Sequence, residues 1–234
     1  IRDDAGKASA SLFYTAYTAP GANRPVTFFY NGGPGSPTVW LHMGSFAPMR
    51  VKTDNPGHVR ASEFALTPNP HSLLDKSDLV FIDAVGAGWS RPLDGRSGKE
   101  FYGVDQDADA FARAIQRYVE KNNRWTSPKI LFGESYGTLR SGAVAALLEQ
   151  RGITLSGVAL LSTIMNYGVR QPGYDQNAMV LLPGYAATAW YHDRLPNRPP
   201  ALKPFLDEVR AFVAGPYAAA LAKGSAISEA EEAS

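Results

Sequence analysis

The sequence contains no cysteine among its 234 residues. A disulfide framework and thiol catalysis are therefore excluded, and nothing in the sequence indicates a redox compartment. No apolar run approaches 18 residues, so we expect no membrane span. An excess of either charge is missing too, because 23 Lys and Arg stand against 22 Asp and Glu. Basic residues do not alternate with aromatic residues in a stripe, which argues against nucleic acid as a partner.

Histidine is scarce, with four in the chain. They form no cluster with carboxylates at metal-ligand spacing, so we predict no metal and no other cofactor. An initiator methionine is also missing, since the chain opens with Ile1. If a leader has been removed, a periplasmic or secreted location is favoured. The remaining composition, 44% hydrophobic and 19% charged, is typical of a globular chain with a sizeable core.

The stretch from Lys129 to Arg140 is the most informative part of the chain. The apolar run 130–132 fits a strand buried on both faces, and residues 139–150 fit an amphipathic helix. Between them, Gly133-Glu-Ser-Tyr-Gly137 matches the Gly-x-Ser-x-Gly nucleophile elbow, whose glycines allow close backbone approach and whose serine is strained. We therefore predict that Ser135 is a nucleophile. The alternative is a glycine-rich strand-to-helix turn with a core serine.

Apolar patterns elsewhere predict a mostly parallel α/β sheet. Strands are expected at 8–17, 25–30, 78–83 and 157–165, and a helix with one buried face at 105–122. Alternating strands and helices with short links form parallel sheets. Ligands bind at the carboxyl ends of such strands, where Asn31 and Ser135 both lie.

Three aspartates occur in or near the first turn of the helix at 105–122: Asp105, Asp107 and Asp109. Their spacing resembles a calcium loop, but Ala110 and Gln116 occupy the positions that require glycine and glutamate. We interpret the three carboxylates as complementing the helix dipole.

The amino-acid composition of the sequence changes after Asn166. Residues 171–195 are rich in Tyr, Ala and Met and are broken by Pro183-Gly184, and helices are expected at 201–214 and 216–223. We predict that 1–166 is the N-terminal part of the sheet domain and that 167–234 is a truncated helical cap region. Ser228 and Glu231 form a capping box before a helix that does not follow. We therefore expect a chain that stops within a larger protein; a frayed acidic tail is the alternative.

A serine nucleophile needs a histidine base that is oriented by a carboxylate. On this type of fold the chain order is serine, then Asp or Glu, then histidine. The sole histidine after Ser135 is His192, with Asp175 as the spacing-compatible acid. Because the acid and base normally follow several further strands, we interpret His192 as a cap or surface residue. The triad Asp and His are expected beyond this chain, and the chain alone is expected to be inactive. A non-catalytic binding module without a base is an alternative.

Acyl transfer also needs backbone N–H groups that stabilise the negative oxygen of the transition state. One donor is expected from Tyr136, the residue after the nucleophile. The other is expected from the glycine loop, where Gly32 and Gly33 allow close approach. A plain turn is the alternative interpretation of that loop.

Four motifs in order resemble the serine carboxypeptidase family: Asn31-Gly-Gly-Pro-Gly-Ser36, Asn69-Pro-His-Ser72, Leu79-Val-Phe-Ile-Asp-Ala-Val-Gly-Ala-Gly-Trp-Ser90 and Gly133-Glu-Ser-Tyr-Gly137. The similarity covers about Ser11 to Asn166, and residues 186–192 resemble the bacterial branch of the family. The resemblance implies an α/β-hydrolase with a helical cap, which removes C-terminal residues from peptides, usually at acidic pH.

The resemblance also implies residue roles. Ser135 is implied as nucleophile, with Gly33 and Tyr136 as oxyanion-hole donors. Asn31 and Glu134 are implied to bind the terminal carboxylate of a peptide substrate, helped by the Gly32 N–H. A glutamate that faces a carboxylate requires one of the two to be protonated, because like charges raise a pKa, and this favours action at low pH.

Three positions depart from the family pattern. Ser45 stands where a second glutamate is often found, Ser36 where a cysteine is common and Leu73 where a tryptophan often follows. They suggest a divergent, cysteine-free branch. The missing acid leaves open an esterase, acyltransferase or lyase that uses the same serine.

Overall fold

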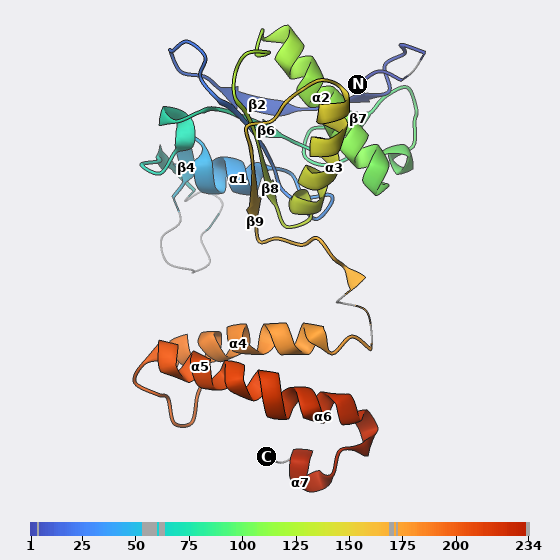
Figure 1. Ribbon diagram of the computed structural model, residues 1–234. Helices are drawn as coiled ribbons and strands as arrows, with labels where there is room; N and C mark the ends of the chain where they lie inside the picture. Colours follow the sequence, from blue (N-terminus) through green and yellow to red (C-terminus); the bar gives the residue numbers. More distant parts are fainter. Residues whose placement is uncertain (4, 53–59, 61–63, 169–170, 172, 233–234) are drawn as a thin grey trace. The chain divides into compact units, whose positions relative to one another are not determined.

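The computed structural model describes residues 1–3, 5–52, 60, 64–168, 171 and 173–232. The chain divides into two compact units, Ile1–Met165 and Asn166–Ser234 (Figure 1). The first unit contains a five-stranded sheet in the order β2 (Tyr14–Tyr17), β6 (Asp78–Ile82), β3 (Val26–Tyr30), β8 (Lys129–Glu134) and β9 (Gly157–Leu161). β2 runs antiparallel to β6, whereas the other neighbours are parallel. The predicted mostly parallel sheet is thus confirmed.

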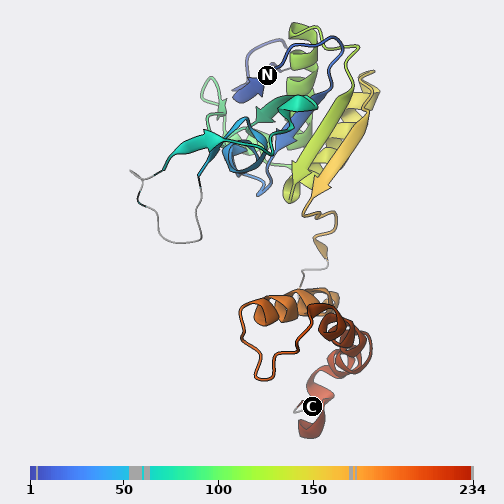
Figure 2. The same cartoon turned by 90° about the vertical axis from the view of Figure 1, so that its left-hand side faces the viewer.

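Helices cover both faces of this sheet, which explains why its central strands are continuously apolar. α2 (Val104–Lys121) and α3 (Tyr136–Gln150) lie on one face and pack on side chains such as Phe28 and Leu131 (Figure 2). On the other face, α1 (Val39–Leu41) and a π-helical turn (His42–Phe46) cover Phe29. The two cores lie on opposite sides of the same strands because side chains alternate along a strand.

Two short antiparallel pairs complete the strands of the first unit. β1 (Ala10–Ser11) pairs with β7 (Arg91–Pro92), and β4 (Met49–Val51) pairs with β5 (Leu66–Pro68). Single 3₁₀ turns occupy Leu73–Asp75 and Gly98–Phe101. The prediction of one strand at 8–17 is therefore wrong, because this segment forms two strands. It divides into β1 and β2 because each half pairs with a different partner.

A buried ion-pair network closes the sheet at the amino ends of the parallel strands. Asp78 is 2% exposed and accepts hydrogen bonds from Arg24 Nε at 2.9 Å and Arg124 Nη1 at 2.5 Å. Burial alone would raise the pKa of this carboxyl. The hydrogen bonds from Arg124 and Arg24 outweigh that effect and hold the pKa below the ordinary aspartate value.

Replacing Asp78 with asparagine is expected to lower the free energy of unfolding at pH 7 by about 3 kcal/mol, because two partly buried guanidinium groups lose their buried counter-charge. A depressed folded-state pKa stabilises the fold fully above the unfolded value of about 3.9, and this stabilisation is lost as the pH falls through the folded pKa. The difference between the parent protein and Asp78→Asn, measured by urea denaturation, should therefore shrink below about pH 4. A difference that stays constant down to about pH 2 would contradict this assignment.

The second unit is helical. Its elements are α4 (Gln176–Tyr191), α5 (Leu202–Phe212), a π-helical turn (Val213–Tyr217), α6 (Ala218–Lys223), a 3₁₀ turn (Gly224–Ala226) and α7 (Glu229–Glu232). α4 and α5 pack side by side as a hairpin (Figure 1). Trp190 Nε1 donates to the Pro199 carbonyl at 2.7 Å, and the Arg198 guanidinium lies 4.1 Å from the Trp190 ring centre. These contacts tie the linker between the helices to α4.

Two expectations for this unit are wrong. α4 continues through Pro183-Gly184 without a break. The fixed φ of proline is helical, and the lost N–H removes one bond of the ladder, while seven residues before Pro183 and packing on α5 maintain the helix. The capping box at Ser228 is followed directly by the helical turn α7.

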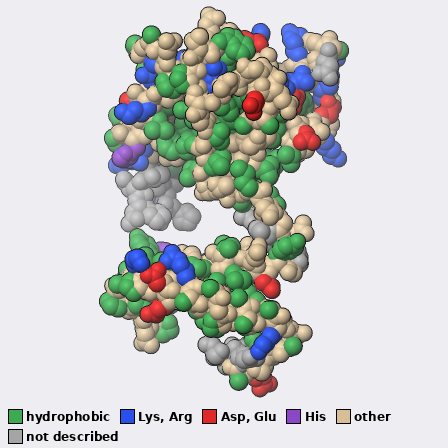
Figure 3. Space-filling view, in the orientation of Figure 1, with side chains coloured by type: hydrophobic (Ala, Val, Ile, Leu, Met, Phe, Trp, Pro, Cys, Tyr) green, Lys and Arg blue, Asp and Glu red, His purple; other side chains and the backbone are tan. Residues whose placement is uncertain are grey.

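Apolar side chains reach the surface of both units (Figure 3). On β9, the outermost strand on its side of the sheet among the described residues, Val158, Leu160 and Leu161 are 41–43% exposed. In the helical unit, Val180 and Tyr185 on α4 are exposed. An apolar edge strand with an open row of backbone groups favours pairing with further polypeptide.

Candidate active site

Ser135 is the single residue between the end of β8 and the start of α3. Its backbone has φ 57° and ψ −122°, a strained conformation for an L-residue. The Ser135 N–H donates to the Leu161 carbonyl at 2.9 Å, and the Ser135 carbonyl accepts from Thr138 N at 2.9 Å. The residue is half-buried rather than part of the core. The bend is therefore held from both sides and presents Ser135 at the carboxyl edge of the sheet.

The two glycines of the elbow are required by contacts that a side chain would break. A Cβ on Gly133 would overlap the carbonyl of Gly137. A Cβ on Gly137 would lie 2.8 Å from the carbonyl oxygen of Tyr30 at the end of β3. These distances leave no room for any residue larger than glycine, as the sequence pattern predicts.

The glycine loop after β3 lies directly against the elbow. A Cβ on Gly32 would lie 2.5 Å from Tyr136 N and 3.0 Å from Ser135 Cβ. Gly33 has φ +106°, which favours glycine, and the Ser36 N–H donates to the Gly32 carbonyl at 3.0 Å to close the loop. The structure thus brings the diglycine segment, Ser135 and Tyr136 together.

Asn31 and Glu134 form a pair beside Ser135. Asn31 Nδ2 donates to Glu134 Oε2 at 3.0 Å, and Asn31 Oδ1 accepts from Leu41 N at 3.1 Å. Asn31 is 4% exposed, whereas Glu134 is half-buried. The hydrogen bonds fix the orientation of the Asn31 amide, which in turn holds the Glu134 carboxyl group at the site.

Arg140 and Asp107 form a buried ion pair next to the glycine loop, and sequence reasoning missed it. Arg140 Nε donates to Asp107 Oδ2 at 2.7 Å. Burial raises the pKa of the Asp107 carboxyl, and Arg140 and Tyr136 partly offset that rise. The interpretation of Asp107 as a dipole complement is thus incomplete. It lies in the first turn of α2, but its side chain is buried because it pairs with α3.

A second buried acid, Asp83, holds the chain after the glycine loop. Asp83 Oδ1 accepts from Thr38 N at 2.7 Å, and its Oδ2 accepts from Trp89 N at 3.3 Å. The Thr38 hydroxyl in turn accepts from Asn31 N at 3.3 Å. Asp83 therefore stabilises the loop that begins at Asn31, although nothing in the sequence pattern predicted a structural role for it.

A signal for the Arg140–Asp107 pair is present in the helical periodicity. Buried residues of α3 recur every four positions: Tyr136, Arg140, Val144 and Leu148. In α2, Asp107 precedes Phe111 and Ile115 at the same spacing. One cation and one anion within apolar stripes of two helices indicate a buried ion pair, because an unpaired buried charge is costly.

His192 and Asp175 do not form a dyad. They lie at opposite ends of the 16-residue helix α4, a separation of roughly 24 Å at 1.5 Å per residue. His192 is exposed and packs edge-on against the Tyr191 ring. This agrees with its interpretation as a surface histidine. His58 lies outside the described residues.

Metal ligation finds no support in the described part of the chain, where no three His, Cys, Asp or Glu side chains gather around a common point. In the same residues, no helix combines the length and the apolar character needed to cross a membrane.

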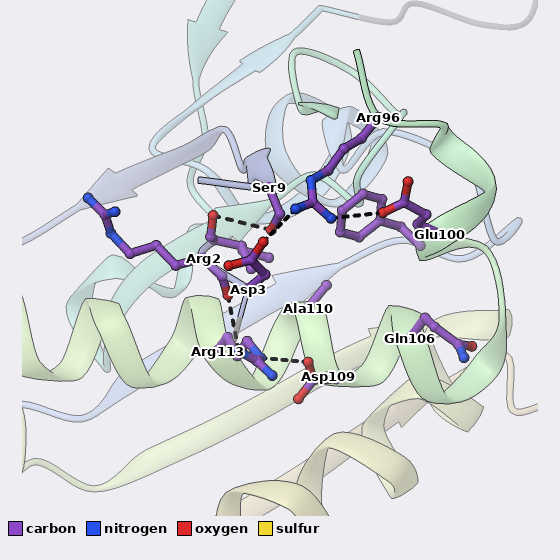
Figure 4. A pocket seen from close by; sticks show the side chains of 11 residues that line it. Arg2, Asp3, Ser9, Arg96, Glu100, Gln106, Asp109, Ala110 and Arg113 are labelled. Atoms are coloured by element: carbon purple, nitrogen blue, oxygen red, sulfur yellow. Dashed lines mark hydrogen bonds and ion pairs between the residues drawn. The ribbon is translucent and has the colours of Figure 1, made fainter. Parts of the chain in front are cut away.

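Two hollows of the first unit differ in character. One, of about 190 Å³, lies between the N-terminal segment and α2 (Figure 4). Two of its cations pair with carboxylates: Arg96 with Asp3 and Glu100, and Arg113 with Asp109. Arg113 Nη1 also donates to the Arg2 carbonyl at 3.0 Å, which attaches the N-terminal segment to α2.

The other hollow, of about 290 Å³, adjoins the glycine loop. It is lined mainly by apolar groups, namely Pro34, Gly35, Ala84, Val85, Gly86, Phe101 and Tyr102, together with Asp107. Apolar cavities of this size next to polar groups are typical of ligand sites.

A strained serine between a central parallel strand and a helix, facing a glycine loop from the neighbouring strand, defines an α/β-hydrolase fold. The model of the serine carboxypeptidase family matches residues 3–192. The chain belongs to that family.

A solved structure agrees with this fold. The chain is similar to Kex1, a prohormone-processing carboxypeptidase from Saccharomyces cerevisiae, with a TM-score of 0.58 and 21% identity over 91% of this chain and 44% of Kex1. It thus spans less than half the length of that relative. A peroxisomal α/β-hydrolase, Lpx1 from Saccharomyces cerevisiae, matches with a TM-score of 0.41 and 13% identity over 76% of this chain and 49% of Lpx1. Curated protein sequences gave no match.

Proposed function

We propose that this chain carries the nucleophile, the oxyanion hole and the carboxylate-binding pair of a serine carboxypeptidase. The observation that supports this most is the contact of the Gly32 backbone with Tyr136 N and Ser135 Cβ. It puts the candidate nucleophile beside two segments that supply N–H donors, Gly33 and Tyr136. Such a constellation suits acyl transfer.

In the proposed mechanism, Ser135 Oγ attacks the carbonyl carbon of the last peptide bond while a histidine base takes its proton. The N–H groups of Gly33 and Tyr136 receive the negative oxygen of the tetrahedral intermediate. The C–N bond then breaks, the released amino acid takes the proton, and water hydrolyses the acyl-enzyme. The histidine and its carboxylate partner are proposed to lie outside this chain, so the chain alone is expected to be inactive.

Asn31 and Glu134 are proposed to select substrates with a free C-terminus. The Asn31 amide, the Gly32 N–H and a protonated carboxyl group at Glu134 can each donate to a carboxylate. Charge-assisted hydrogen bonds of this kind favour a terminal carboxylate over a terminal amide.

The proposal is tested with the full-length protein and N-blocked peptides, with release of C-terminal residues followed by mass spectrometry. A serine-directed phosphonate is expected to modify Ser135, identified in the digested protein, and to stop the release. Modification at another residue, or modification of Ser135 without loss of C-terminal trimming, would refute the proposal.

Replacing Glu134 with alanine is expected to raise KM about tenfold for peptides with a free C-terminus, because the variant loses a charge-assisted bond that contributes about 1.5 kcal/mol or more. KM for the matching C-terminal amides should stay within about twofold. Steady-state kinetics on the peptide pair measure this ratio at acidic and neutral pH. Equal changes for both peptides would argue against a carboxylate-binding role.

Ser45 favours a second candidate, an esterase, acyltransferase or lyase that uses the same serine. Its hydroxyl donates to the Trp40 carbonyl at 3.1 Å, so it supplies no acid where the family often has a glutamate. Turnover of matched blocked esters and peptides separates the two functions. Efficient C-terminal trimming of peptides would dismiss the second candidate.

The remaining part of the same protein is the proposed partner of this chain. The exposed apolar residues of β9 would be covered by a further strand that extends the sheet. We also propose that the helical unit, 167–234, is the cap region of the same protein, and that 1–166 is the N-terminal part of the catalytic domain.

A further inference from the structure

Arg140 is a fully buried charge on α3, four residues after Tyr136. Its side chain is 0% exposed. Burying an ionised group is costly unless both its charge and its N–H donors are matched. What the guanidinium binds therefore indicates why a charged residue stands at this position.

The guanidinium divides its donors between one carboxylate and two backbone carbonyls. Nε and Nη2 donate to Asp107 at 2.7 and 3.2 Å. Nη1 donates to the Asn31 carbonyl at 2.7 Å, and Nη2 donates to the Pro34 carbonyl at 3.2 Å. Asn31 and Pro34 flank the diglycine segment on both sides, so one rigid planar group holds both of its ends.

The same network reaches the other donor of the proposed oxyanion hole. The Arg140 guanidinium carbon lies 5.2 Å from the centre of the Tyr136 ring, and Tyr136 also lowers the pKa of the Asp107 carboxyl. The ion pair therefore touches the two segments that supply Gly33 N–H and Tyr136 N–H.

We propose that Arg140 is a positioning residue of the oxyanion hole, which fixes the glycine loop against Tyr136 through the carbonyls of Asn31 and Pro34. This inference rests on the proposed function of Gly33 and Tyr136. An oxyanion hole lowers the barrier only when its donors are held in place before charge develops. A displacement of about 1 Å can reduce the rate about 100-fold.

The main test uses the double variant Asp107→Leu/Arg140→Met in the full-length protein. Apolar groups of similar volume often replace a buried ion pair without loss of stability. We expect kcat to fall about 100-fold, KM to change less than twofold and the pH profile to keep its shape. Hydrogen exchange of the amides at 31–36 should become faster. A folded double variant with unchanged kcat would overturn the proposal.

Two single variants, Arg140→Lys and Arg124→Lys, test the positioning role of Arg140 even if the double variant does not fold. Arg140→Lys keeps a positive charge beside Asp107, but one ammonium group cannot reproduce the fork that reaches both carbonyls. We expect its kcat, per folded molecule, to fall about tenfold or more. The matched control is Arg124→Lys, which alters the buried ion pair at Asp78, at the opposite ends of the strands. It should change stability and leave kcat within about twofold.

Equal losses of kcat in Arg140→Lys and Arg124→Lys would reduce Arg140 to a general structural role and overturn the proposal. Unchanged hydrogen exchange at 31–36 in both Arg140 variants would do the same. A parent protein without turnover that depends on Ser135 would instead refute the proposed function, and the catalytic part of this inference with it.

Discussion

Replacing Ser135 with alanine is expected to lower kcat for release of C-terminal residues by about 10⁵-fold or more in the full-length protein, because no acyl-enzyme can form. Binding should be nearly unchanged, since the Gly33 and Tyr136 donors and the Asn31–Glu134 pair remain. The fold should also tolerate the change within about 0.5 kcal/mol, because Ser135 is half-buried and its backbone contacts persist. Steady-state kinetics with a blocked dipeptide and thermal unfolding measure both effects.

The matched control is Ser36→Ala in the neighbouring loop, where the hydroxyl donates weakly to the Pro37 carbonyl at 3.4 Å. Its kcat should stay within about twofold of the parent value. Ser135→Gly adds a test of strain, because glycine tolerates φ 57°. It should be as inactive as Ser135→Ala but about 1 kcal/mol more stable than that variant. Activity of Ser135→Ala within 100-fold of the parent would remove Ser135 from the nucleophile role.

The strands of the sheet could be predicted from the sequence because each one is determined by a short run of neighbouring residues. β3 and β6 are short, mostly apolar segments that are buried along their whole length, and a strand buried on both faces needs only such a run. The elbow could be predicted for a similar reason. Gly133 and Gly137 have no space for a side chain, so only glycine fits at these positions, and the two glycines are visible in the sequence.

The contacts that support the loop do not follow from any one local pattern, because they join distant residues. Arg140 and Asp107 are 33 positions apart, and Asp107 already satisfied a simpler rule as an acid in the first turn of a helix. The antiparallel position of β2 is equally non-local, since β2 pairs with β6 rather than with its neighbour in sequence, β3. At Pro183, packing on α5 overrides a local helix-breaking signal.

Replacing Gly32 with alanine is expected to lower kcat about 10³-fold, close to the effect of losing an oxyanion-hole donor. The new Cβ would lie 2.5 Å from Tyr136 N and 2.7 Å from the Glu134 carbonyl oxygen. Both are backbone atoms, so the loop or the elbow must move by about 1 Å. The movement separates Gly33 from Tyr136 without removing any polar group. Kinetics on a blocked dipeptide, with circular dichroism as the check on folding, measure the result.

Gly35→Ala is the control for this variant, because it makes the same change three residues further along the loop. Nothing lies within 4 Å of a Cβ built on Gly35, so activity should stay within about twofold and stability within about 0.5 kcal/mol. If any added side chain in the loop lowered activity, Gly32→Ala and Gly35→Ala would lose activity to the same extent. A large loss confined to Gly32→Ala would instead support the view that catalysis depends on close contact between the diglycine segment and the elbow. Equal activity in both variants would contradict the proposed oxyanion hole.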